Sequence, residues 1–149
     1  MQTLTEFMTA DHKACDDRFA LAEQPAYANN WNGADTAFNA FRAAMTHHFH
    51  LEEHILFPAL LAAGGPGAPV QMMTMEHAQM NSLLDNMAAA LARKEATGYS
   101  GLSETLLIVL QQHNLKEEQI LYPIAERLLA GSWDTLHSRM QSVQQEYQH

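Results

Sequence analysis

The chain contains little cysteine, little positive charge and no long apolar run. With one cysteine in 149 residues it can form no intrachain disulfide and contains no Cys-x-x-Cys motif. Eight basic residues against 17 acidic ones give a net charge of −9, which argues against nucleic-acid binding. No apolar stretch approaches about 18 residues, and the first residues lack a signal-peptide pattern, so we expect no membrane span and a cytoplasmic location. The length fits one domain, residues 1–149.

Strand-type alternation of apolar residues is also missing, and apolar residues recur instead every three or four positions. Breaker residues divide the chain into helical segments of about 3–23 (ending before Pro25), 35–62, 69–97, 100–129 (capped by Ser100 or Ser103) and 132–147 (capped by Ser132). Thr3 and Glu6 form a capping-box pattern at the first segment. These lengths and short loops predict an all-α fold: an antiparallel up-down-up-down four-helix bundle over residues 3–130 with an additional C-terminal helix. Pro58 and Pro123 should each kink a helix or loosen its hydrogen bonds.

The chain overlays on itself without a gap when it is shifted by 65 residues. The pattern predicts two helical hairpins related by pseudo-twofold symmetry. The matches concentrate on polar residues at core-facing positions of the helices, and Ile120 and Ile124 continue that core-facing series in the fourth segment. The polar positions are His12, His48, Glu52, His77, His113 and Glu117.

Buried histidines and glutamates are costly unless they are paired or bind a metal. The His-x-x-x-Glu spacing places both side chains on one helix face, and bundle cores build metal sites from facing helices. Imidazole and carboxylate without thiolate suit iron, manganese or zinc. Four histidines and two glutamates in symmetric positions favour two ions with both glutamates bridging, and the remaining positive charge favours an oxo, hydroxo or exogenous anionic bridge. Hydrogen-bonded core residues are the alternative, which suits one isolated histidine better than six residues in register.

These residues resemble the hemerythrin-like (HHE cation-binding) family over residues 3–130. The resemblance depends on His12 and His77, and on the stretches His48-Phe-His-Leu-Glu52-Glu53-His-Ile-Leu-Phe-Pro58 and His113-Asn-Leu-Lys-Glu117-Glu118-Gln-Ile-Leu-Tyr-Pro123. It implies an antiparallel four-helix bundle around a non-haem di-iron centre bridged by two carboxylates. Members of the family bind O2 reversibly, sense O2, NO or iron, or repair iron–sulfur centres.

The sequence departs from the oxygen carriers of this family at two positions. Met73 stands where carriers have a fifth histidine, and Glu117 lies four residues after His113 where carriers have an aspartate five residues after. Both differences argue against stable O2 carriage, and the cysteine-bearing N-terminal segment of the repair members is absent. We therefore expect a di-iron protein that binds or senses O2, NO or iron, and a binding protein rather than an enzyme.

Several alternatives stay open from the sequence. One is a repair or redox protein that donates iron or reduces NO or peroxide, and another is a helical interaction module with a structural metal. Zinc or manganese could replace iron in a preparation. A homodimer and, for a sensor, a separate protein partner also stay open. Ferritin-like oxidases are disfavoured, because the only Glu-x-x-His pair is Glu146–His149.

Other residues near the predicted ligands have two interpretations each. They either wall in a small-ligand pocket or simply pack the core, and packing is favoured for Met8, Cys15, Met45, Met73, Met80 and Leu110. Tyr122 either donates a hydrogen bond near the site or packs beside Pro123. His47, His50 and His54 point away from the ligand face, so we expect them to face solvent rather than bind a surface metal. Glu53 and Glu118 repeat at the same offset, which hints at a supporting or surface ion-pair role.

Overall fold

The computed structural model describes residues 2–27 and 29–148, and every regular element in these stretches is a helix. The elements are α1 (Leu4–Tyr27), α2 (Trp31–Leu51), η1 (Glu52–Leu56), α3 (Phe57–Ala62), α4 (Gly67–Ala92), α5 (Ala96–Lys116), η2 (Glu117–Leu121), α6 (Tyr122–Leu128) and α7 (Trp133–Gln148). The elements η1 and η2 are single π-helical turns. The all-α prediction is confirmed. Among the described helices none is long and apolar enough to cross a membrane, and His149 lies outside the described residues.

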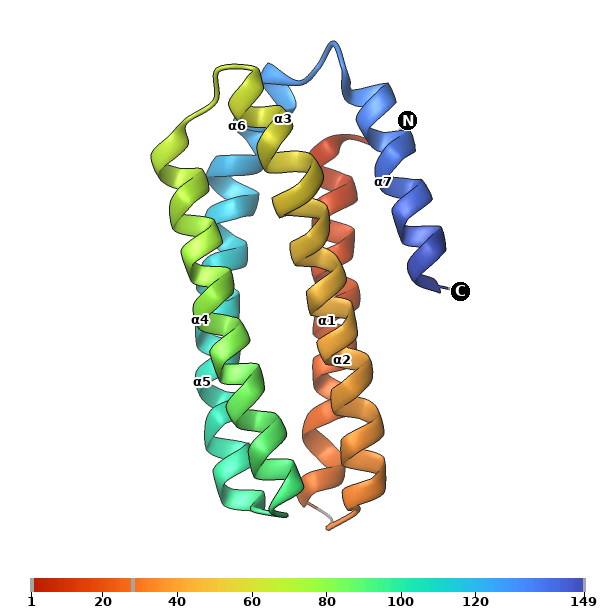
Figure 1. Cartoon of the computed structure of the whole chain (residues 1–149), viewed down its shortest axis with the longest axis vertical. Coiled ribbons are helices and arrows are strands. Elements are labelled where there is room, and N and C mark those ends of the chain that lie inside the picture. Colours follow the sequence, from red (N-terminus) through yellow and green to blue (C-terminus); the bar gives the residue numbers. More distant parts are fainter. Residues whose placement is uncertain (1, 28, 149) are drawn as a thin grey trace.

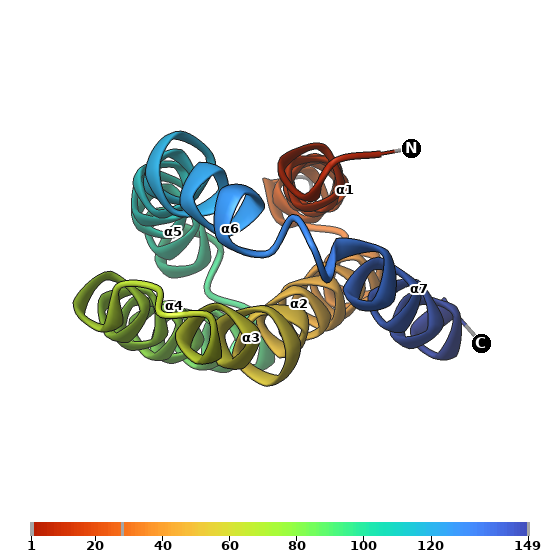
Figure 2. The same ribbon diagram turned by 90° about the horizontal axis from the view of Figure 1, so that it is seen from above.

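The long helices α1, α2, α4 and α5 lie side by side along the long axis of the molecule (Figure 1). Backbone angles stay helical through both π-turns, so α2 continues through η1 into α3, and α5 continues through η2 into α6. Seen from above, the long helices surround a common interior, and α7 lies outside it (Figure 2). The helix α7 packs on α2 and η1, and the Phe7 ring of α1 meets Trp133 edge-on.

The first helix begins at the predicted capping box. The Thr3 amide donates to the Glu6 carboxylate at 3.0 Å, and the Glu6 amide donates to the Thr3 hydroxyl at 3.1 Å. The end of the helix was predicted wrongly, since α1 continues past Pro25 to Tyr27. Only two helical residues follow Pro25, so the hydrogen bond that its missing N–H cannot donate is one of the last in the helix.

Other boundaries also differ from the prediction, and α4 starts at Gly67 instead of residue 69. The helix α2 starts at Trp31 instead of about residue 35, because the Asn30 side chain accepts from the Gly33 amide at 3.1 Å and caps it. The helix α4 ends at Ala92 instead of near residue 97. Lys94 takes a left-handed backbone conformation (φ 56°), and the Glu95 amide donates to the Ala90 carbonyl at 2.9 Å, a helix ending usually made with glycine.

These cap differences move the next helix as well. The helix α5 starts at Ala96, so neither Ser100 nor Ser103 caps it, and both lie inside it. The helix α7 starts at Trp133 as predicted, directly after Ser132. The Leu136 amide donates to the Ser132 carbonyl at 3.1 Å, and the Ser132 hydroxyl donates to the Leu129 carbonyl at 3.4 Å. A cap formed by a side chain or by a left-handed lysine leaves little trace in the glycine and proline pattern.

The apolar core forms two clusters that share no residue. One cluster surrounds Phe19, Phe41, Leu84 and Leu106, and the other surrounds Met8, Leu56 and Leu121. The six predicted polar positions belong to neither cluster, and on α1, α4 and α5–η2 they lie between the two clusters in sequence. On α2–η1, His48 and Glu52 flank Phe49 of one cluster and Leu51 of the other. A buried polar layer thus separates two dry regions, each of which excludes water from it.

The π-turns change which residues face the core. In η2 the Tyr122 amide donates to the Glu117 carbonyl, five residues earlier, just before Pro123. Such a turn inserts one residue relative to an α-helix, so the core positions shift by one. Ile120 is exposed and Ile124 only half-buried, whereas Leu121 and Tyr122 are buried. The core assignment of Ile120 was therefore wrong, whereas Ile124 is half-buried and packs against the apolar cluster around Met8 and Leu121. The loosened hydrogen bonds expected at Pro123 are confirmed.

The same shift occurs in η1, where the Phe57 amide donates to the Glu52 carbonyl just before Pro58. Glu52 and Phe57 therefore lie on one face of the helix, as Glu117 and Tyr122 do in η2. The two π-turns are 65 residues apart in sequence, at the same point of each repeat. Each turn begins at one of the predicted glutamate ligands.

Candidate metal centre

All six predicted ligand residues are buried, and their side chains converge between the four long helices. His12 lies on α1, His48 on α2, His77 on α4 and His113 on α5, while Glu52 and Glu117 open the two π-turns. Every one of them has at most 3% of its surface exposed. The cost of burying six ionisable side chains must be offset by pairing between them or by a bound cation.

The first group of converging atoms consists of His12, His48 and Glu117, whose ligand atoms all lie within 4.8 Å of one another. The two Nε2 atoms of His12 and His48 are 3.0 Å apart, and His12 Nε2 is 3.1 Å from Glu117 Oε1. Glu52 Oε1 lies 3.3 Å from His48 Nε2. Two ring nitrogens and a carboxylate oxygen thus share one small volume.

The second group consists of Glu52, His77, His113 and again Glu117, also within 4.8 Å. His77 Nε2 lies 3.0 Å from Glu52 Oε1, and His113 Nε2 lies 3.2 Å from Glu117 Oε1. Glu117 belongs to both groups, and Glu52 approaches a histidine of each group. The arrangement brings two sets of potential ligands together around two central carboxylates.

A carboxylate faces the outer nitrogen of each of the four histidines. His12 Nδ1 lies 2.7 Å from Glu118, His48 Nδ1 2.7 Å from Asp11, His113 Nδ1 2.8 Å from Glu76, and His77 Nδ1 3.5 Å from Glu53. In each pair the carboxylate belongs to a neighbouring helical segment, so the four pairs form a closed circuit: α1 to α2, α2–η1 to α4, α4 to α5, and α5–η2 back to α1.

Sequence reasoning missed this role for Asp11 and Glu76, and for Glu53 and Glu118 gave only a hint. The 65-residue offset held the necessary pattern, because Asp11 corresponds to Glu76 and Glu53 to Glu118. Periodicity placed them off the ligand-facing side of their helices, and their contacts are with the next helix instead. Such contacts depend on how neighbouring helices pack, which one helix's pattern does not contain.

The donor chemistry of the cluster fits a cation. A carboxylate acceptor holds a proton on Nδ1, so Nε2 of a neutral histidine presents a lone pair to the centre. His77 Nε2, His113 Nε2 and Glu52 Oε1 are buried without a hydrogen-bond partner, although histidine and carboxylate atoms approach each other to 3.0–3.2 Å. Lone pairs brought together in this way require either protons or metal ions between them.

In the metal-free protein, the pKa shifts reflect a competition between burial and the charges of neighbouring groups. Burial disfavours the charged form of His48, but Glu52 and the hydrogen bond to Asp11 outweigh it and hold its pKa well above the ordinary value. Burial likewise opposes charging of His113, yet contact with Glu117 raises its pKa. Burial would raise the pKa of Glu117, but its contacts with Glu52 and the histidines hold it well below the usual range. Without metal, the raised pKa values of His48 and His113 and the lowered pKa of Glu117 favour charged imidazoles beside a charged carboxylate.

Tyr122 supplies a further polar contact at the centre. Its hydroxyl donates to Glu52 Oε2 at 2.7 Å, with Glu117 Oε1 as a second possible acceptor at 3.1 Å, and lies 3.1 Å from His12 Nε2. Burial and the two carboxylates raise its pKa well above the ordinary value, so the phenol stays protonated. The sequence left open whether Tyr122 donates or packs; in the structure it donates. The repeat-related residue is Phe57, whose ring stacks on His77, so only one half of the site has this donor.

The other candidate pocket residues are buried in the two apolar clusters. Cys15, Met45, Met80 and Leu110 belong to one cluster, and Met8 and Met73 belong to the other. Burial raises the pKa of the Cys15 thiol to about 12, so it is not an accessible thiolate. These positions agree with the packing interpretation.

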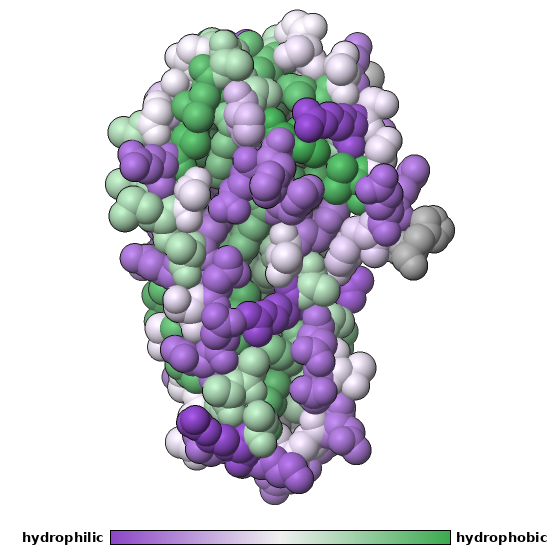
Figure 3. All heavy atoms as spheres, in the orientation of Figure 1, coloured by the Kyte–Doolittle hydropathy of each residue, from purple (hydrophilic) through white to green (hydrophobic). Residues whose placement is uncertain are grey.

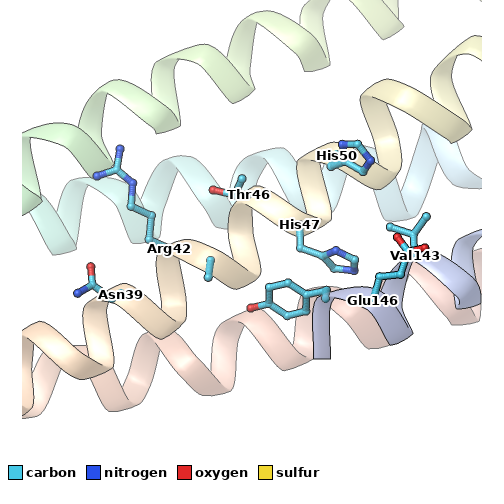
Figure 4. A pocket seen from close by; sticks show the side chains of 9 residues that line it. Asn39, Arg42, Thr46, His47, His50, Val143 and Glu146 are labelled. Atoms are coloured by element: carbon cyan, nitrogen blue, oxygen red, sulfur yellow. The ribbon is translucent and has the colours of Figure 1, made fainter. Parts of the chain in front are cut away.

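The remaining histidines lie outside the cluster. His50 and His54 are exposed as expected, with ring centroids 4.5 Å apart. His47 is half-buried and stacks on Tyr147 of α7, so its solvent-facing assignment was wrong. His47 and His50 line an open pocket of about 680 Å³ between α2 and the end of α7 (Figure 4), which none of the six predicted ligands lines. Its open shape and lack of converging ligand atoms distinguish it from the buried cluster.

A family model described as the hemerythrin HHE cation binding domain matches residues 3–125. The matched range contains all six converging residues, both π-turns and the four outer carboxylates. Comparisons with curated proteins and with solved structures found no match.

Proposed function

Because the chain belongs to the hemerythrin HHE cation-binding domain family, we propose that it is a non-haem di-iron protein that binds or senses O2, NO or iron itself. The observation that carries the proposal is the pair of buried ligand groups that share Glu117. We interpret the helix arrangement as one domain, an antiparallel up-down-up-down four-helix bundle of two 65-residue repeats with an additional C-terminal helix.

In this proposal each ligand group holds one ion. His12 and His48 hold the first ion, His77 and His113 hold the second, and Glu52 and Glu117 lie between the two. Two divalent ions carry four positive charges, which the two central carboxylates only partly neutralise; the four outer carboxylates supply further negative charge. When bound, paired ferrous ions supply electrons and an open coordination position for a small ligand.

The residues of the chain prepare the site before metal arrives. Asp11, Glu76 and Glu118 hold Nδ1 of three histidines and aim each Nε2 inward. The Tyr122 hydroxyl has both central carboxylates within hydrogen-bond distance, the nearer being Glu52, and can donate its proton to either. The apolar clusters above and below exclude water, which strengthens every electrostatic contact in the layer.

An anaerobic titration with Fe(II), followed by elemental analysis and optical spectroscopy, tests the proposal. We expect about two irons per chain and an absorption spectrum that changes reversibly with O2 or NO. Glu117→Gln should lose most of the binding, whereas His50→Ala, at an exposed histidine, should bind like the wild type. A protein that takes up only zinc under these reducing conditions would contradict the proposal.

A structural metal is the second candidate, and the same preparation separates it. In that case removing the metal should unfold the chain, because binding and folding are then coupled. The two apolar clusters and the outer ion pairs need no metal, which favours a bundle that stays folded without it. Retained helical circular dichroism after chelation therefore supports the ligand-binding role. Turnover of NO or peroxide over many equivalents would support an enzyme instead.

A further inference from the structure

An apolar groove opens on the side of the molecule away from α7, between the start of α4 and η2. Its volume is about 280 Å³, and the residues that form it include Pro69, Met72, Met73, Lys116, Ile120 and Leu121. Met72 and Ile120 are 52% and 56% exposed. In Figure 3 apolar side chains gather toward the upper end of the molecule, which carries the start of α4.

The internal repeat identifies a second copy of this groove in the other half of the chain. Subtracting 65 takes Met72 to Phe7 and Ile120 to Ile55, which lie on α1 and η1. There the same positions are only 5% and 3% exposed. The two halves of the bundle therefore have related grooves, one covered and one open.

The helix α7 covers the related groove, which lies between α1 and η1. The Phe7 ring meets Trp133 and His137 edge-on, and the Trp133 ring nitrogen donates to the Gln2 carbonyl at 2.9 Å. Trp133, Leu136 and Met140 join the same apolar cluster as Leu4, Phe7, Leu51 and Ile55. The chain itself thus shows what fits a groove of this kind: an amphipathic helix with one aromatic and several aliphatic or methionine side chains on one face.

We propose that the open α4–η2 groove binds an amphipathic helix of a separate partner protein. A second copy of this chain is a poorer occupant, since its α7 already covers its own groove and moving it would expose as much apolar surface as it buries. Among the positions at which the two grooves differ, Lys116 is the one that introduces a charge, where the other half has Leu51. Lys116 pairs with Glu76, but its side chain is 42% exposed and has further donors to offer. The partner helix should therefore carry an acidic side chain beside its apolar face.

A labelled peptide of residues 132–147 is the probe, because it has the apolar face of α7 and an acidic residue near each end, Asp134 and Glu146. Fluorescence anisotropy measures its binding to the full chain. We expect one site, weakened at least tenfold by Ile120→Lys, which places a charge in the groove, and weakened severalfold by Lys116→Gln. Ile108→Lys is the matched control: Ile108 is equally exposed, at 57%, but lies about 18 Å away along the same helix.

Both isoleucines are exposed, so we expect each variant to fold, and circular dichroism checks this. The proposal is overturned if the wild-type chain does not bind the peptide. It also fails if Ile120→Lys binds the peptide as well as the wild type does, which would place the peptide in the groove between α1 and η1 that α7 covers. It is also overturned if sedimentation shows a wild-type dimer that Ile120→Lys dissociates, because a second copy would then cover the groove. The test is run with and without metal, so it stands apart from the iron proposal.

Discussion

Replacing Tyr122 by phenylalanine tests whether the central carboxylates depend on a protein donor when metal is absent. The substitution fits sterically, because the repeat-related position already holds Phe57 on an equivalent π-turn. It removes the hydroxyl that donates to Glu52 at 2.7 Å and has Glu117 as a second acceptor at 3.1 Å, and both carboxylates are fully buried. A hydrogen bond to a charged group contributes about 1.5–3 kcal/mol. The carboxylate oxygens that lose the hydroxyl are buried and have no access to water in its place.

We therefore expect Tyr122→Phe to lower the free energy of unfolding of the metal-free protein by about 1.5–3 kcal/mol. For a chain of this length that corresponds to a fall in Tm of roughly 3–12 °C by differential scanning calorimetry. In the metal-loaded protein the loss should be smaller, because a bound cation satisfies the same carboxylate oxygens. The dependence on metal is the specific part of the prediction.

Tyr99→Phe is the matched control. The Tyr99 hydroxyl is also buried, but it donates to the neutral Ala22 carbonyl at 3.0 Å, in the apolar cluster away from the ligands. Its loss should cost about 0.5–1.5 kcal/mol whether or not metal is bound. The reasoning fails if Tyr122→Phe costs the same in both states, or if it destabilises the metal-free protein no more than a surface substitution does.

Three other outcomes follow from the contacts at the site. Glu117→Gln, at the residue shared by both ligand groups, should reduce metal stoichiometry by elemental analysis from about two to one or none. Asp11→Asn should weaken metal binding about 10–100-fold in a chelator competition without loss of helical circular dichroism, whereas Glu53→Gln, 3.5 Å from its histidine, should have less effect. Apparent metal affinity should rise as the pH increases above about 6.5, because the raised pKa of His48 means that metal must displace a proton; a flat profile would contradict this.

The sequence predicts the ligand layer well because the pattern that defines it is local and repeated. Core-facing periodicity and the 65-residue offset placed His12, His48, His77 and His113 correctly at buried positions. Helix ends were predicted less well, because they depend on caps made by an asparagine side chain and by a left-handed lysine. Contacts between helices, such as Asp11 with His48, could not be predicted from one helix at a time.

The register beyond each glutamate depends on the π-turns, which the helical period does not contain. An uninterrupted α-helix would have placed Ile120 in the core, whereas the inserted residue turns Leu121 and Tyr122 inward instead. The prolines indicated loosened hydrogen bonds but not the extra residue. Since Glu117 and Tyr122 are five residues apart, the π-turn is what lets the hydroxyl reach the carboxylate of its own helix.

The two repeats are alike at the six predicted ligand residues of the buried polar layer and differ just outside this layer. One half has the Tyr122 hydroxyl where the other has Phe57, and one half has an apolar groove covered by α7 where the other leaves it open around Lys116. In the proposed function the symmetric ligands would give two similar cation positions, but a small ligand or a partner helix would meet two different halves. Selectivity for a small ligand or for a partner helix should therefore depend on the residues at which the two repeats differ. These residues can be exchanged without changing the six ligand residues.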